Sequence, residues 1–383
     1  MAFDSPTPAV ASPTDDAASA ALRYWLRPVR RYLDQDQVEE VSINRPGEVF
    51  VLARDIWTRH EEPVLTFDYC LALARLIATY TNQRLDEQFN LLSASLPLET
   101  AHSDDAVLGA GGVPLIGERC QVVIPPSCQA GTVCLSFRKH STASSTLDAL
   151  SDAGRFSRCV PSPNAITSDD IERLIADPST PPEDVELLRH LKLRAWSEFL
   201  SSAVRAEKNI VIAGATGSGK TFVTRTLIKA ISATDRIITI EDTPELPLPE
   251  HPNHVHLFYS KDGQGVSMST PKSLMSACMR LLPSRILLSE VRGDEAWDYL
   301  RGLGSGHSGS ITTIHANSAD EAFAELLKLT KSSETGQTLS TEDLYANMHT
   351  VIDVVLHMKH KYATEIYYNP LRKRFALQGL GRH

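Results

Sequence analysis

The chain has 383 residues, of which 42% are hydrophobic and 22% charged, and its formal net charge is −9. This length allows two domains of ordinary size, and the composition is typical of a globular protein. The acidic balance argues against a broad basic surface that coats nucleic acid, and no apolar run approaches the roughly twenty residues that cross a bilayer.

The first third of the chain predicts a tail followed by a domain. Residues 1–20 are rich in Ala, Ser, Pro and Asp and lack the basic and apolar regions of a signal peptide, so we expect a disordered tail. Residues 21–140 predict a mixed α/β domain. Its expected elements are a hairpin with strands at 41–43 and 49–51, a helix at 69–80, a glycine-rich loop at 101–117, and strands at 120–124 and 132–137.

The remainder predicts a linker and a second domain. Residues 141–195 are dominated by Ser, Thr, Asp and Pro and indicate a linker with short helices around 146–153 and 168–176. From Trp196 the apolar spacing becomes helical, and strands then alternate with helices, which indicates a parallel sheet in a nucleotide-binding fold over residues 196–383. The expected strands are 209–213, 236–241, 254–258, 285–290 and 309–314.

The strongest motif in the sequence is G-x-x-x-x-G-K-[ST], a phosphate loop. It is formed by Gly214, Ala215, Thr216, Gly217, Ser218, Gly219, Lys220 and Thr221. A predicted strand precedes it and a helical pattern follows, as the motif requires, which disfavours a chance glycine-rich turn. Backbone N–H groups of such a loop bind phosphate oxygens, Lys220 reaches the β- and γ-phosphates, and the Thr221 hydroxyl binds Mg²⁺. We therefore predict that the chain binds a nucleoside triphosphate.

Two predicted strands end in carboxylates that suit the same site. The strand 236–241 ends at Glu241 and Asp242, and the strand 285–290 ends at Glu290. In doubly wound sheets, ligands gather at the carboxyl ends of the strands. A phosphate loop needs such acids to hold Mg²⁺ and the attacking water, so we favour a functional role over a solvated loop carboxylate.

Two histidines bracket the last predicted strand. His307 lies in the turn before it and His315 follows it. A histidine there can sense the γ-phosphate by hydrogen bonding, or His307 can be solvated while His315 is a satisfied core residue; the spacing alone does not choose between these.

Metal-ligand patterns are weak elsewhere in the sequence. The spacing of His251, His254 and His256 matches no known ligand pattern, which disfavours a metal site there. The six cysteines contain no C-x-x-C pair and are expected to be buried thiols.

Four sequence boxes, in order, resemble the traffic ATPases of bacterial type IV secretion systems. They are GATGSGKT, ITIEDTPEL, RILLSEVRGDEAW and GSGHSGSITTIHANS. The segments EEVSINRPGEVFV, GERCQVVIPP and GTVCLSFRK resemble the N-terminal domain of the same family. The resemblance covers roughly residues 25–360.

This resemblance implies a RecA-like C-terminal domain and a homo-hexameric ring. Each ATP site would lie between the two domains, with Lys220 and Thr221 on the phosphates and Mg²⁺. Glu241 would polarise the attacking water, and Glu290 would hold Mg²⁺ directly or through a water. His307 would be the functional histidine of its box.

The resemblance also implies how the first domain and the linker take part. Arg119 and Arg138 match arginines that reach the nucleotide phosphates. The segment 141–190 resembles an extended linker that lets one subunit's C-terminal domain pack against a neighbour.

The implied function is nucleotide-driven motion between domains that powers substrate export or pilus assembly. The ring would lie in the bacterial cytoplasm, peripheral to the inner membrane without an integral segment, and would work with other type IV secretion components and a secreted protein or DNA–protein substrate. The chain departs from the family at Ser289, where Gly is usual, and at Leu282-Pro283-Ser284, where Arg-Pro-Asp is usual.

The sequence favours this function over three others. A type II secretion or type IV pilus motor belongs to the same superfamily. The residues of the histidine box and the lack of the tetracysteine zinc motif of the type II assembly ATPases disfavour it. An ATP-binding scaffold with little turnover is disfavoured because both acids are present. A DNA-dependent helicase is disfavoured by the acidic balance.

Overall fold

The computed structural model describes residues 13–54, 56–97, 116–139, 145–259 and 269–379. The chain divides into two compact units, and the boundary lies between Ser141 and Thr142. Each unit has its own hydrophobic core. Within the described ranges, no helix is long and apolar enough to cross a membrane.

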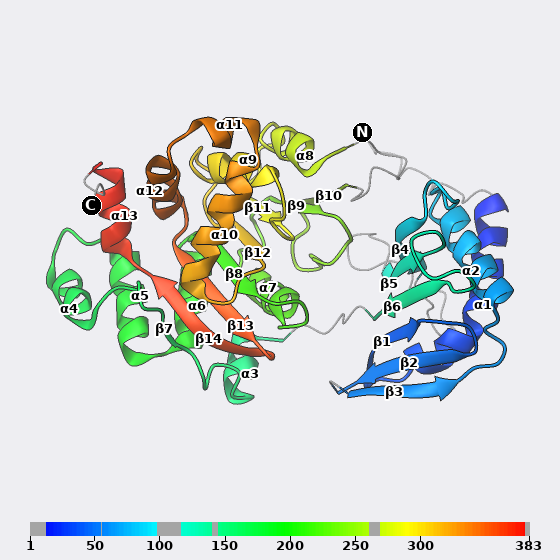
Figure 1. The fold of residues 1–383 in the computed structure, drawn as a ribbon. Helices are drawn as coiled ribbons and strands as arrows, with labels where there is room; N and C mark the ends of the chain where they lie inside the picture. Colours follow the sequence, from blue (N-terminus) through cyan, green and yellow to red (C-terminus); the bar gives the residue numbers. More distant parts are fainter. Residues whose placement is uncertain (1–12, 55, 98–115, 140–144, 260–268, 380–383) are drawn as a thin grey trace, which may run out of the picture. The chain divides into compact units, whose positions relative to one another are not determined.

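The first unit is a six-stranded antiparallel sheet with two helices (Figure 1). Its elements are α1 (Pro13–Leu33), β1 (Val38–Ile43), β2 (Glu48–Ala53), β3 (Ile56–Glu61), α2 (Phe67–Tyr80), β4 (Leu91–Pro97), β5 (Ile116–Val123) and β6 (Cys134–Arg138). The strand order is β3-β2-β1-β6-β5-β4. The helices pack side by side and bury their apolar stripes, including Leu26 and Leu73, in one core with the sheet.

The predicted hairpin, helix and strands of this unit are confirmed as β1–β2, α2, β5 and β6. The expected tail differs, because α1 already begins at Pro13; residues 1–12 lie outside the described residues. Most of the loop expected at 101–117 also lies outside them. Strands β3 and β4 were not predicted: β3 is exposed along its whole length, so it lacks the alternation of a half-buried strand.

The second unit is a doubly wound α/β domain. Its elements are α3 (Leu147–Asp152), β7 (Val160–Pro161), α4 (Ser168–Ala176), α5 (Pro182–Leu193), α6 (Trp196–Arg205), β8 (Ile210–Gly214), α7 (Lys220–Ile228), β9 (Ile237–Glu241), β10 (His254–Phe258), α8 (Pro271–Cys278), β11 (Arg285–Leu288), α9 (Glu295–Leu303), β12 (Ile311–Ile314), α10 (Ala319–Lys331), α11 (Glu334–Thr338), α12 (Thr341–Val351), β13 (Val354–Lys359), β14 (Tyr362–Tyr368) and α13 (Pro370–Leu377). All five predicted strands are confirmed, as β8 to β12.

The eight strands of this unit have the order β10-β9-β11-β12-β8-β13-β14-β7 (Figure 1). Six neighbouring strands in this order, namely β10, β9, β11, β12, β8 and β13, are parallel. Their carboxyl ends therefore lie at one edge of the sheet. Alternate residues of β8 enter different cores: Ile210 and Ile212 pack with α3 to α7, whereas Val211 and Ala213 pack with α8, α9, α10 and α12. Burial on both faces explains the continuous apolar runs of these strands.

The segment expected as a linker belongs to this second unit. Leu150, Phe156, Leu174 and Leu187 share one core with Ile212, and β7 pairs with β14. The compact fold therefore extends well before residue 196. Its prolines do not break elements, because they occupy ends, such as Pro182 in the first turn of α5. The predicted helices near 146–153 and 168–176 are confirmed as α3 and α4.

The cysteine prediction is correct for four of the six thiols. All six are free; Cys70, Cys120, Cys159 and Cys278 are buried, while Cys128 and Cys134 are half-buried. Burial raises the pKa of the Cys70 thiol to about 11, so that thiol is protonated at neutral pH.

Candidate active site

The phosphate loop connects the buried strand β8 to helix α7. Gly214 has φ +152°, and a Cβ there would lie 2.4 Å from the carbonyl oxygen of Met358. Gly219, with φ +99°, is the N-cap of α7 and gives it no side-chain cap. The Ser218 hydroxyl is buried and has no hydrogen-bond partner among the described residues. An uncapped helix N-terminus beside an unsatisfied hydroxyl suits an anionic phosphate group.

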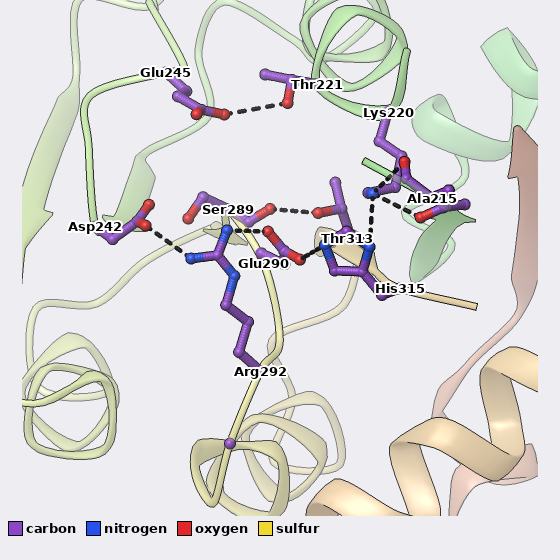
Figure 2. A network of polar contacts seen from close by, with 12 residues as sticks. Ala215, Lys220, Thr221, Asp242, Glu245, Ser289, Glu290, Arg292, Thr313 and His315 are labelled. Carbon is purple, nitrogen blue, oxygen red and sulfur yellow. Dashed lines mark hydrogen bonds and ion pairs between the residues drawn. The ribbon is translucent and has the colours of Figure 1, made fainter. Parts of the chain in front are cut away.

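Lys220 lies inside the loop and is 8% exposed. Its Nζ donates to the carbonyl oxygens of Gly214 at 2.7 Å and Ala215 at 3.0 Å, and it lies 3.5 Å from Nδ1 of His315 (Figure 2). The ammonium group is therefore held at the mouth of the loop, near the position that a bound phosphate would take.

Three further elements bring polar groups to the same edge of the sheet. Glu245 follows β9, Glu290 follows β11 and His315 follows β12, so all three lie beyond the carboxyl ends of parallel strands. Thr221 Oγ1 donates to Glu245 Oε2 at 3.1 Å (Figure 2). Glu245 and Glu290 therefore lie at the carboxyl ends of the strands, where ligands gather in open α/β sheets.

A chain of contacts runs from the phosphate loop to the acidic loop after β9. His315 Nε2 lies 2.7 Å from Glu290 Oε1, and Arg292 bonds Glu290 Oε2 through Nη2 and Asp242 Oδ2 through Nη1, the latter at 2.8 Å (Figure 2). The path is therefore Lys220, His315, Glu290, Arg292, Asp242. It links the cation that would meet phosphate to carboxylates on two neighbouring strands.

His315 in this chain is a neutral bridge. Burial lowers the pKa of His315, and although Glu290 raises that pKa, Lys220 and Arg292 lower it further. A neutral ring has one donor and one acceptor nitrogen. In this structure Nε2 faces Glu290 Oε1, and Nδ1 faces the Lys220 ammonium group.

The sequence analysis expected Glu241 in the site, but in the structure its side chain is not exposed to the site. Its side chain is fully buried, with Oε2 accepting from the N–H of Glu245 at 2.6 Å and Oε1 accepting from Thr239 Oγ1 at 2.6 Å. Every residue of β9 is buried, and the carboxylate beside the phosphate loop belongs instead to Glu245, which follows the strand. The Thr243-Pro244 dipeptide between these glutamates was the sign in the sequence that the strand ends before Glu245.

His307 also differs from its expected position. It precedes β12, whereas the phosphate loop follows β8, which is parallel to β12. His307 therefore lies at the opposite edge of the sheet, where its Nδ1 is 3.2 Å from the carbonyl oxygen of Pro283. The histidine that reaches the loop in this chain is His315. The departure at Ser289 leaves its hydroxyl buried without a partner among the described residues, next to Glu290.

Arg119 and Arg138 belong to the first unit and occupy directly opposed positions on β5 and β6. Arg119 is half-buried and Arg138 is exposed. Their contact with nucleotide stays a prediction.

Comparisons with known proteins agree with a phosphate-loop site, because the proteins that resemble this chain are secretion ATPases. Residues 186–361 match the family model described as "Type II/IV secretion system protein". The fold is also that of the pilus retraction motor PilT with bound ADP, at TM-score 0.54 and 15% identity over 93% of this chain and 87% of PilT.

Relatives cover nearly the whole chain. The type IV secretion system protein VirB11 of Bartonella henselae is 37% identical over 94% of this chain and 96% of its own length. VirB11 of Brucella suis is 35% identical over 94% of both chains. Similarity of this extent includes both units and all the boxes around the phosphate loop. The chain therefore belongs to the VirB11 family, the ATPases of type IV secretion systems.

Proposed function

We propose that ATP is hydrolysed at the loop 214–221 with the help of Mg²⁺. The observation that carries the proposal is the meeting of the Lys220 ammonium and the Thr221 hydroxyl with Glu245, Glu290 and His315 at one sheet edge. Phosphoryl transfer depends mainly on positioning and on charge stabilisation, and this set of groups supplies both.

The oxygen donors of the site fit Mg²⁺. Hydroxyl and carboxylate oxygens are its preferred protein ligands, and it usually keeps several waters. Thr221 would bind the ion directly, and Glu290 would hold it through a water. Bound Mg²⁺ neutralises charge that develops on the phosphate oxygens.

Within this site, we assign the role of polarising the attacking water to Glu245, in place of Glu241. The Glu245 carboxylate contacts Thr221, whereas Glu241 has no exposed surface. A base must lie within hydrogen-bond reach of the water that it polarises. His315 would sense the presence of the γ-phosphate, because a bound phosphate would compete with His315 for contact with the Lys220 ammonium group.

The wider function is the movement of substrate through a type IV secretion system by a hexameric ring. Family membership supports this proposal, and PilT, the pilus retraction motor, has the same fold. Nucleotide bound at the phosphate loop would also engage Arg119 and Arg138, and hydrolysis would release them, which couples turnover to domain motion. The ring would lie at the cytoplasmic side of the inner membrane with other secretion components, and would act on a secreted protein or DNA–protein complex.

The test is the ATPase rate of Lys220→Ala. We expect turnover to fall to background, because no other described cation lies inside the loop to meet the β- and γ-phosphates. Lys229→Ala is the control, since that exposed lysine caps the far end of the same helix. Turnover by Lys220→Ala at the unmodified rate would refute the site. Unmodified protein that binds ATP without hydrolysing it would instead indicate a nucleotide-gated scaffold.

A further inference from the structure

Glu241 lies beneath the loop that carries Glu245 and is bonded on both carboxylate oxygens. Oε2 accepts from two backbone N–H groups, those of Glu245 at 2.6 Å and Leu246 at 2.9 Å. Oε1 accepts from Thr239 Oγ1 at 2.6 Å and lies 3.0 Å from His256 Nδ1. A carboxylate with this many donors, and with no exposed surface, has no lone pair directed at solvent.

These bonds determine where the Glu245 side chain can go. Glu241 holds the N–H of Glu245, and Arg225 Nε on α7 donates to the Glu245 carbonyl oxygen at 2.5 Å. Leu246 is buried in the core beside α7. With its backbone fixed on both sides, Glu245 directs its carboxylate to Thr221. A group held in this way needs no reorganisation when the reaction begins.

His256 completes the support from the neighbouring strand. It lies on β10, in register with Thr239 of β9, and its side chain is 9% exposed. The ring stacks on Phe258 at 6.0 Å between centroids and meets His254 edge-on at 5.0 Å. Its Nδ1 is 2.8 Å from the Thr239 hydroxyl, which itself donates to Glu241. Both neighbours of Nδ1 are therefore acceptors, so Nδ1 carries the proton that binds them.

We propose that Glu241 and His256 are positioning residues for ATP hydrolysis: together they fix the loop after β9 so that Glu245 faces the phosphate loop. Neither contacts the reacting atoms. The edge strand β10 thereby becomes part of the catalytic support, although two strands, β9 and β11, separate it from β12. The inference rests on the proposed role of Glu245.

A double-mutant cycle tests the coupling between His256 and Glu245. We expect His256→Leu to lower kcat about tenfold while KM for ATP changes less than about threefold, since Lys220 and the loop amides are untouched. In a Glu245→Gln background, His256→Leu should cause no further fall, because the group that it positions no longer acts. Independent, multiplying losses would overturn the inference.

Two further variants separate positioning from general damage. His256→Asn keeps an N–H donor close to the place of Nδ1, so it should restore most of kcat. His254→Leu removes a ring from the same strand that does not bond Glu241, so it should leave kcat unchanged. Failure of His256→Asn to exceed His256→Leu, or an equal loss in His254→Leu, would mean that β10 matters only for packing.

Hydrogen exchange gives a readout that needs no turnover. The amides of Glu245 and Leu246 should exchange faster in His256→Leu than in the unmodified protein, and at the unmodified rate in His254→Leu. Unchanged exchange in His256→Leu overturns the positioning role, whatever the ATPase assay gives. Absence of ATP hydrolysis by the unmodified protein would refute the proposed function alone, because the exchange rates would still test the support of this loop.

Discussion

At the scale of single residues, one histidine joins the cation and the acid of the site. His315 lies 3.5 Å from Lys220 Nζ and 2.7 Å from Glu290 Oε1, and Arg292 bonds the other carboxylate oxygen of Glu290. A γ-phosphate that draws Lys220 toward itself removes one of these contacts. In the proposed mechanism, the state of the nucleotide would thereby be passed to Glu290 and, through the Arg292–Asp242 ion pair, to Asp242.

We therefore expect His315→Ala to lower kcat by at least about tenfold, the low end of what a lost polar contact in a transition state costs. ADP affinity should change little, because the loop amides still bind phosphate. The measurement is steady-state ATP hydrolysis together with ADP titration. His307→Ala, at the other sheet edge, should have the smaller effect. The reverse ranking would restore the expectation drawn from the sequence.

The residues of the site were predictable to different degrees. Lys220 and Thr221 follow from a motif with fixed spacing, and Glu290 from an apolar strand that ends in a single acid. The choice between Glu241 and Glu245 did not follow, since both lie in one acidic box. It depends on how the loop after β9 is held and on the position of β10, and these are set by tertiary packing.

At the scale of elements, α10, α12 and β14 meet around a buried histidine. His349 on α12 is 4% exposed, its ring lies 4.4 Å from that of Phe323 on α10, and its Nδ1 is 3.1 Å from the hydroxyl of Tyr367 on β14. Burial, with a smaller effect of Arg372, lowers the pKa of His349 to about 3. The ring therefore stays neutral in the folded protein over most of the acid range.

This burial predicts a loss of stability in acid. His349 becomes protonated near pH 6.5 in the unfolded chain but only near pH 3 in the folded protein. Between these two pH values, the unfolded state therefore binds one more proton than the folded state. The free energy of unfolding should then fall as the pH falls below about 6.5, by up to about 1.4 kcal/mol per pH unit from this group.

The measurement is urea unfolding at several pH values between about 7.5 and 5. His349→Gln cannot titrate, so its free energy of unfolding should fall less steeply with decreasing pH, even where its absolute stability is lower. Carboxylates that titrate in both proteins cancel in the difference. Parallel curves for the two proteins would contradict the assignment.

The elements themselves show what local pattern can and cannot predict. The parallel strands β8 to β12 were predictable because each is apolar throughout and lies between helical patterns. The prediction of a linker at 141–195 was wrong for the described part, residues 145–195, because the helices there are short and lie among prolines. Its apolar residues, such as Phe156 and Leu187, belong to a core that β8 completes, and this membership is visible only in the folded structure.

At the scale of the whole molecule, the residues that we propose to meet nucleotide belong to two units with separate cores. The phosphate loop, Glu245, Glu290 and His315 belong to the second unit, and the opposed Arg119 and Arg138 belong to the first. The family resemblance supports a nucleotide that meets both sets. Such a nucleotide would join two units that otherwise have independent cores, which is a direct way to convert binding into domain motion.

The expected outcome is that Arg119→Ala and Arg138→Ala each weaken ATP binding about tenfold or more, since a hydrogen bond to a charged group contributes about 1.5–3 kcal/mol. ATP affinity is measured by titration and turnover by steady-state kinetics. Arg75→Ala, an exposed arginine on α2, is the control. Melting temperatures without nucleotide should match across the three variants, while the stabilisation by added ATP should shrink only for Arg119 and Arg138. Equal stabilisation in all three would restrict the nucleotide site to the second unit, and domain motion would then need another cause.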